Sequence, residues 1–180
     1  MNNKQSARSF ASLLETSSIP ELGPRCRPDA KSIPGIESEL NGFPGYIALP
    51  SSRAQAIKSL LLLWHDHLDA SHGISQSLHD ETGSYIHGLM HRREPDYFNA
   101  KYWFRRVPKH PAFEKFSSEL KEKLGSAPEA ELLIEGGQWN PFVFVDLCEK
   151  AERGHDKHFI QTFKKVQQLE FHALVQWLVR

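Results

Sequence analysis

The sequence has few cysteines, no long hydrophobic run and no excess of charge of either sign. Its two cysteines, Cys26 and Cys148, form no CxxC motif, which favours reduced thiols in a cytoplasm over a disulfide framework. The longest apolar run, SLLLLW, is far too short to cross a bilayer. The polar start, MNNKQSARSF, lacks the apolar stretch of a signal peptide. These absences predict a soluble, cytoplasmic protein that does not enter a membrane.

The equal numbers of acidic and basic residues exclude a strong overall electrostatic field around the protein. Lys and Arg together number 22, and so do Asp and Glu, so nothing steers the whole molecule toward nucleic acid or an anionic membrane. Charge is nevertheless uneven along the chain. Between His87 and His110 the only acids are Glu94 and Asp96. The bases in that segment are Arg92, Arg93, Lys101, Arg105, Arg106 and Lys109.

Strand alternation of useful length is also lacking, whereas helical periodicity is frequent. A chain of 180 residues can bury one core without disulfides. We therefore predict an all-α, single-domain bundle of about six to eight helices. Residues 1–50 are expected to form a short amphipathic helix, Ser6 to Thr16, and a long irregular arm, Ile19 to Pro50, packed on the domain. The arm holds six of the eleven prolines, and residues 51–180 are expected to form the helical domain.

Capping residues, prolines and glycines give the expected limits of the helices. The longest helix begins at Ser51 or Ser52 and runs to about Leu78. The Asn140-Pro141 pair is typical of a helix start, and Gly125 is a good residue to follow a helix end. The other expected helices span 84–94, 96–107, 111–124, 128–135, 140–153 and 156–179.

A polar stripe follows the expected helix around Trp64. At 100° per residue it lies along the edge of the apolar face and contains His65, Asp69, His72 and Gln76. Imidazole and carboxylate groups three or four residues apart can share a metal ion or orient one another. A solvated helix edge is the alternative. Asp66 and His67 point elsewhere and are predicted to be ordinary surface residues.

The next expected helix carries His87 and His91, also four residues apart. This HxxxH spacing suits a divalent metal, although it lacks the Glu of the metalloprotease signature. A short turn, residues 80–84, makes the two helices antiparallel neighbours. We predict a site whose catalytic residues are Asp69, His72, His87 and His91. Its metal ligands would be the same four residues together with Glu170, and Zn²⁺, Fe²⁺ or Mn²⁺ would suit them.

Glu170 lies in the middle of the apolar stripe of the helix predicted over 156–179. A carboxylate that faces a core must be paired, metal-bound or protonated, because an isolated buried charge is prohibitive. Its partner could be an arginine of the HRRE or WFRR segments or one of the histidines. Both possibilities remain open at this point.

The segment DYFNAKYWFRR combines aromatic and basic residues, with aromatics nearly all round the expected helix. Such a helix is usually buried on two sides. The neutral total charge favours a small anionic ligand over nucleic acid. The expected ligand-binding residues are Arg92, Arg93, Asn99, Lys101 and Tyr102. An arginine network that ties helices together is the alternative.

Several segments resemble a family of bacterial and fungal proteins that has no known activity. The shared pattern is W-x-D-x-L-D-x-x-H, H-x-x-x-H-R-R-E-x-D-x-x-N-x-K-Y-W and Q-x-x-E, and it covers most of Trp64 to Trp177. The chain departs from the family at Phe171, where Trp is favoured. The resemblance implies that these are motif positions: Asp69, His72, His87, His91, Arg92, Arg93, Glu94, Asp96, Asn99, Lys101, Tyr102 and Glu170.

Three functional hypotheses follow from these patterns. The first is an enzyme or metal-binding protein that acts on a small anionic ligand through its His and Asp residues, with a metal or by general acid–base catalysis. The second is a non-catalytic module that binds a ligand or a partner. The third makes the His/Arg/Glu motif a buried network that specifies the helix arrangement.

Overall fold

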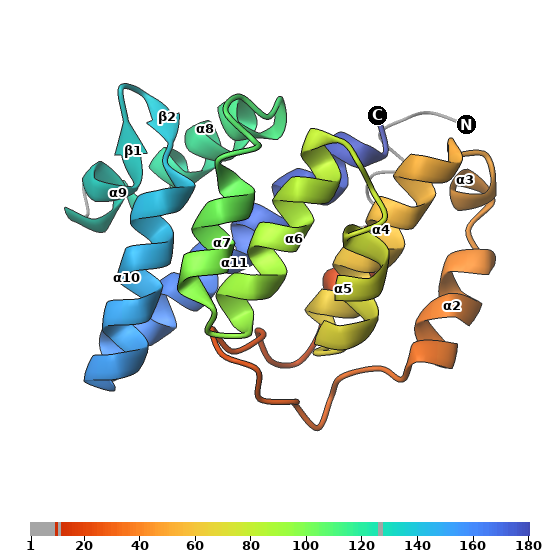
Figure 1. Ribbon diagram of the computed structural model, residues 1–180. Coiled ribbons are helices and arrows are strands. Elements are labelled where there is room, and N and C mark those ends of the chain that lie inside the picture. Colours follow the sequence, from red (N-terminus) through yellow and green to blue (C-terminus); the bar gives the residue numbers. More distant parts are fainter. Residues whose placement is uncertain (1–9, 11, 126–127) are drawn as a thin grey trace.

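The computed structural model describes residue 10 and residues 12–125 and 128–180, and this part of the chain is all-α (Figure 1). A 3₁₀ turn, η1, spans Ser12–Leu14. The α-helices are α2 (Ile33–Asn41), α3 (Pro44–Ile47), α4 (Ser51–Trp64), α5 (Leu68–Ser75), α6 (Glu81–Arg93), α7 (Tyr97–Phe104), α8 (Ala112–Leu124), α9 (Pro128–Leu133), α10 (Pro141–Gly154) and α11 (Lys157–Leu178). Two short antiparallel strands, β1 (Ile134–Glu135) and β2 (Gln138–Trp139), join α9 to α10.

Local capping explains several of the helix ends. The side chain of Asn140 accepts hydrogen bonds from the backbone N–H groups at the start of α10, and Asp156 does the same for α11. Helix α8 ends at Gly125, whose φ of +57° is easily reached by glycine. The predicted helices over 111–124, 140–153 and 156–179 are confirmed to within a few residues.

The prediction of an irregular arm over Ile19 to Pro50 was wrong in its second half, where α2 and α3 form. Their prolines, Pro34 and Pro44, lie in the first helical turn, where the missing N–H costs nothing. The predicted helix from Ser6 to Thr16 falls partly outside the described residues; of those described, Phe10 is helical and Ser12–Leu14 form η1.

The arm is fastened to α11. Lys164 forms an ion pair of 2.8 Å with Glu21, and Gln167 donates from Nε2 to the backbone oxygens of Pro20 and Glu21 at 3.2 and 3.3 Å. Lys164 and Gln167 are buried. The first half of the arm is therefore part of the packed structure.

The single helix predicted from residue 51 to Leu78 was also wrong, because the chain breaks between α4 and α5. At the break Asp66 has a φ of +66°, a conformation that Asp adopts more readily than most residues. Its buried carboxylate pairs with Arg93 at 2.7 Å and with Arg27 at 2.8 Å. Asp66 is therefore an interior anchor, and the expectation that it is an ordinary surface residue was wrong. The stripe from His65 to Gln76 is interrupted as well.

Helix α6 is the centre of the bundle. It lies between α7 on one side and α4 with α5 on the other, while α11 crosses behind (Figure 1). Every residue from Thr82 to Arg93 is buried. The polar side chains of α6 must therefore find partners within the protein.

Helix α7 lies between α6 and α10 (Figure 1). Ala100 and Phe104 are buried, but Phe98 is 80% exposed and Tyr102 is 41% exposed. The helix is therefore buried on two sides, as expected, but the aromatic side chains of Phe98 and Tyr102 do not contribute to that burial. Across the described residues, no helix is both long enough and apolar enough to cross a membrane.

Candidate metal site

Three histidines from two helices meet at the contact between α5 and α6. His72 comes from α5, and His87 and His91 come from successive turns of α6. One nitrogen from each ring lies within 4.8 Å of the other two. The ring centroids are 4.7 Å apart for His72 and His87, 5.4 Å for His72 and His91, and 4.8 Å for His87 and His91. We call these three residues the histidine cluster.

Local structure brings the cluster together. Asp80 caps α6 by accepting from the N–H of Gly83, and the following turns place His87 and His91 on one face, four residues apart. Gly88 lies beside the ring of Phe104, and a Cβ there would come within 2.8 Å of it. Glycine at this position therefore allows α7 to pack closely against α6.

The close approach of α7 places Trp103 against His87. The two rings are stacked, with centroids 3.9 Å apart and planes 15° apart. Burial lowers the pKa of His87 to about 3, and the nearby His91, His72 and Arg106 act in the same direction. His87 is therefore neutral at physiological pH, the state in which imidazole binds a metal. Its Nδ1 is buried and has no hydrogen-bond partner among the described residues.

The ring of His91 is oriented by a carboxylate. Its Nδ1 lies 2.9 Å from Oε2 of Glu94, and because a carboxylate only accepts, Nδ1 must carry the proton. The lone pair of Nε2 is then available to a metal ion. A carboxylate that orients a ligating histidine is a common feature of metal sites.

A second group, made of His91, Glu94 and Asp96, also satisfies the distance for shared ligation. It is less suited to a metal ion, because Glu94 is exposed and Asp96 already caps α7 by accepting from the N–H and Nδ2 of Asn99. The histidine cluster is the better candidate, with Glu94 as its supporting group.

Two of the five predicted metal ligands lie elsewhere. Asp69 is exposed in the first turn of α5, and it lines a surface pocket of about 500 Å³ together with Asp66 and Glu94. Glu170 lies inside the bundle, where it accepts from Arg92 at 2.6 Å and from the hydroxyl of Tyr85 at 3.0 Å. The sequence left open whether Glu170 pairs with an arginine or binds metal, and the structure shows the arginine.

The predicted anion-binding arginines are both committed to interior carboxylates. Arg92 pairs with Glu170, and Arg93 pairs with Asp66 and also donates to the carbonyls of Glu21 and Leu63. We call these ion pairs, with Arg27 and Tyr85, the arginine network. Because neither guanidinium is more than 1% exposed, neither can meet a ligand from solvent.

The other predicted ligand-binding residues lie on α7 and are also engaged. Asn99 bonds to Asp96, Lys101 pairs with Asp146, and Tyr102 accepts from Arg106 at 2.7 Å. Trp103 of α7 stacks on His87, and Arg106, just after α7, lies over the ring of Trp103. Neither was among the expected site residues, and their only signal in the sequence was membership of the WFRR segment.

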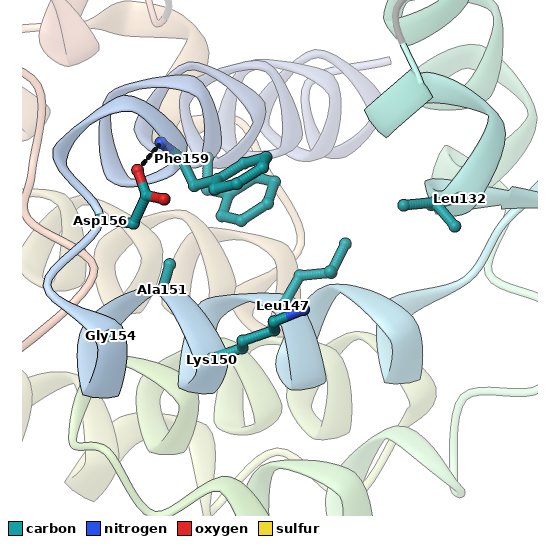
Figure 2. Close-up of a pocket in the computed structure, with 8 residues that line it drawn as sticks. Leu132, Leu147, Lys150, Ala151, Gly154, Asp156 and Phe159 are labelled. Atoms are coloured by element: carbon teal, nitrogen blue, oxygen red, sulfur yellow. Dashed lines mark hydrogen bonds between the residues drawn. The ribbon is translucent and has the colours of Figure 1, made fainter.

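A separate apolar pocket of about 280 Å³ lies between α10 and α11, near α9 (Figure 2). Leu132, Leu147 and Phe159 line it together with the stem of Lys150. Among the described residues it contains no group of metal ligands, and it is formed by other helices than those that hold the histidine cluster. The groups that could share a metal ion in this part of the chain lie instead at α5, α6 and the joint before α7.

Comparisons of the chain with protein-family models, with curated proteins and with solved structures found no match.

Proposed function

We propose that this protein binds a divalent transition-metal ion through His72, His87 and His91, with Glu94 orienting His91. The observation that carries the proposal is the approach of three imidazole nitrogens to within 4.8 Å of one another at the contact of two helices. Nδ1 of His87, which is buried without a hydrogen-bond partner among the described residues, supports it. Buried polar atoms in proteins are nearly always hydrogen-bonded, and of the six side-chain exceptions among the described residues this is the one that lies in the histidine cluster.

The ligand set favours Zn²⁺ or Fe²⁺ over Mn²⁺. Neutral imidazoles suit zinc and iron, whereas manganese prefers carboxylates, and Asp69 and Glu170 lie outside the cluster. Three protein ligands leave one position of a tetrahedral ion open, which is typical of catalytic rather than structural zinc sites. An ion held in this way supplies Lewis-acid chemistry and lowers the pKa of a bound water. We therefore propose metal-assisted chemistry on a small ligand.

Metal analysis tests this proposal. Untagged protein purified without chelator is expected to contain stoichiometric metal, and Co²⁺ added to the metal-free protein is expected to give the visible absorption of a nitrogen-ligated ion. His72→Ala should abolish both, and because His72 is only half-buried the helical circular dichroism should persist. His158→Ala removes an exposed histidine of α11 and should change neither. Wild-type protein that holds no metal and gives no cobalt absorption would refute the proposal.

A structural role for the arginines of the same motif has its own support. Arg92, Arg93, Asp66 and Glu170 are interior residues, and the bonds among them join α6 to the α4–α5 junction and to α11. We propose that this part of the motif specifies one helix arrangement, because any other packing would leave a buried charge unpaired.

The cysteines bear on the compartment. Cys26 and Cys148 are both free thiols, and Cys148 is buried. Free thiols are typical of a reducing compartment, which supports our proposal of a cytoplasmic location.

A further inference from the structure

A pocket of about 500 Å³ opens where the end of α5, the start of α6 and the end of α7 meet. Among the residues that line it are Gln76, Ser84, Trp103 and Arg106. Its volume lies within the range of small-molecule sites.

The pocket adjoins the histidine cluster on two helices. Gln76 lies one turn after His72 at the end of α5, and Ser84 lies one turn before His87 on α6. Trp103 lines the pocket and also stacks on the ring of His87. A ligand in the pocket would consequently lie beside the histidines, with a hydroxyl and an amide available for hydrogen bonds.

Arg106 supplies a cation that no carboxylate neutralises. Its guanidinium carbon lies 4.8 Å from the ring centroid of Trp103 and 4.9 Å from that of Tyr102, and the side chain donates to the Tyr102 hydroxyl. Among the described residues it has no ion pair, whereas Arg92, Arg93 and Lys101 each have one. The aromatic rings hold the guanidinium in place and leave donors for a ligand.

The acids of the pocket limit the charge of that ligand. Asp80 and Glu81 also line it, and Asp80 is occupied as the cap of α6. Two nearby carboxylates repel a multiply charged anion more than a singly charged one. A carboxylate, which a guanidinium binds through two parallel hydrogen bonds, therefore suits the pocket better than a phosphate.

We infer that this pocket binds a small monocarboxylate, held by Arg106 beside the metal ion. The inference rests on the proposed function, since it places the ligand next to the ion of the histidine cluster. It also assigns to Arg106 the anion-binding role that was expected of Arg92 and Arg93.

Full-length protein loaded with Co²⁺ provides the test. Sodium acetate, added at constant ionic strength, is expected to shift the visible cobalt absorption with saturation. Arg106→Gln should weaken acetate binding about 10- to 100-fold and leave the spectrum without acetate unchanged, because only the charged hydrogen bonds to the ligand are lost. Arg105→Gln is the matched control, since Arg105 is also exposed but does not line the pocket, and its loss changes the net charge equally.

Each outcome decides between the two proposals. If cobalt gives no absorption, the metal site is refuted and the inference fails with it. A cobalt spectrum that acetate does not change refutes the carboxylate site alone, and so does equal weakening by Arg105→Gln and Arg106→Gln. Tighter binding of inorganic phosphate than of acetate would refute the inference that the ligand is a singly charged carboxylate.

Discussion

Helix α6 places two kinds of polar chemistry next to each other in the sequence. His87 and His91 face α5, whereas Arg92 and Arg93 contact α11 and the junction between α4 and α5. Each arginine is matched by a buried carboxylate. Among the described residues, the two histidines have no buried carboxylate as a partner. Nδ1 of His87 has no hydrogen-bond partner there, and the only acid bonded to His91 is the exposed Glu94. Arg92 also leaves Nε and Nη1 without hydrogen-bond partners in this part of the chain, so the buried counter-charge, rather than an unpaired atom alone, distinguishes the structural arginines from the histidines.

The two regions should also differ energetically. A buried ion pair stabilises a fold little compared with apolar side chains of similar volume, but breaking it is costly because the remaining charge has no solvent. The arginine network is therefore expected to control folding. The histidine cluster is expected to control metal affinity. The first two substitutions below each affect one region and should leave the other unchanged, and the third concerns histidines outside both regions.

The largest effect is expected from Asp66→Asn. It keeps a side chain that tolerates the φ of +66° but leaves both Arg27 and Arg93 without their carboxylate. The free energy of unfolding should fall by about 5 kcal/mol, the upper end for a broken buried pair. Urea denaturation of the metal-free protein measures it. Asp146→Asn breaks the more exposed pair with Lys101 and should cost less than about 1 kcal/mol. Equal losses for the two variants would contradict the distinction.

Glu94→Gln should give the opposite result. Its side chain is half exposed, so the stability of the metal-free protein should hardly change. Affinity for Zn²⁺ should fall about 10- to 100-fold, because the substitution removes the charge that orients and polarises His91. Competition with a chromophoric chelator measures the affinity. The exposed Glu114 of α8 offers the control, Glu114→Gln, which should keep wild-type affinity. A stability loss without a change in affinity would place Glu94 with the structural residues.

Lowering the pH should destabilise the protein through two buried histidines whose ring nitrogens are both hydrogen-bonded. His65 accepts from the N–H of Lys31 and bonds to the carbonyl of Leu13, while His110 accepts from the N–H of Ala112 and bonds to the hydroxyl of Thr82. Burial lowers the pKa of each from 6.5 to about 4. Between these values the unfolded chain binds more protons than the folded one, so stability falls as the pH drops from about 6.5 to about 4.

A single substitution measures how much one of these histidines contributes to the pH dependence of stability. With chelator present, His110→Asn should reduce the slope of unfolding free energy against pH by about 1.4 kcal/mol per pH unit, the value for one proton. Urea unfolding at several pH values between 7 and 4 gives the slope. His158→Asn, on the exposed start of α11, should leave it unchanged. An unaltered slope in His110→Asn would mean that folding does not lower the pKa of His110.

Local signals in the sequence predicted the parts of the fold that depend on a few neighbouring residues. Asn140 and Asp156 cap the helices that follow them, and Gly125 ends α8, as each pattern indicated. The break at Asp66 could not be predicted in this way, because no proline or glycine marks it. It depends on Arg27 and Arg93, which lie 39 and 27 positions away.

The candidate site was predicted in part for the same reason. The four-residue spacing identified His87 and His91, and their helix brings them together without help from the rest of the fold. The burial of Glu170 followed from its place in an apolar stripe, but the choice between arginine and metal needed the tertiary contacts. Nothing in the sequence shows which of the adjacent Arg105 and Arg106 would bind a ligand. Only the packing of Arg106 against the rings of Trp103 and Tyr102 distinguishes the two.

The bonds between the arm and α11 also fix an order of events. Glu21 and Lys164 are 143 positions apart, so during synthesis the arm leaves the ribosome long before its partner exists. Until α11 appears, the Glu21 carboxylate and the carbonyl of Pro20 lack these partners, whereas the Glu21 carbonyl can already accept from Arg93 of α6. Contacts of such long range form late, because a large loop must close first. Docking of the segment around Glu21 on α11 is therefore expected to be a late step of folding, and a nascent chain halted before α11 should expose this segment to proteases more than the complete chain does.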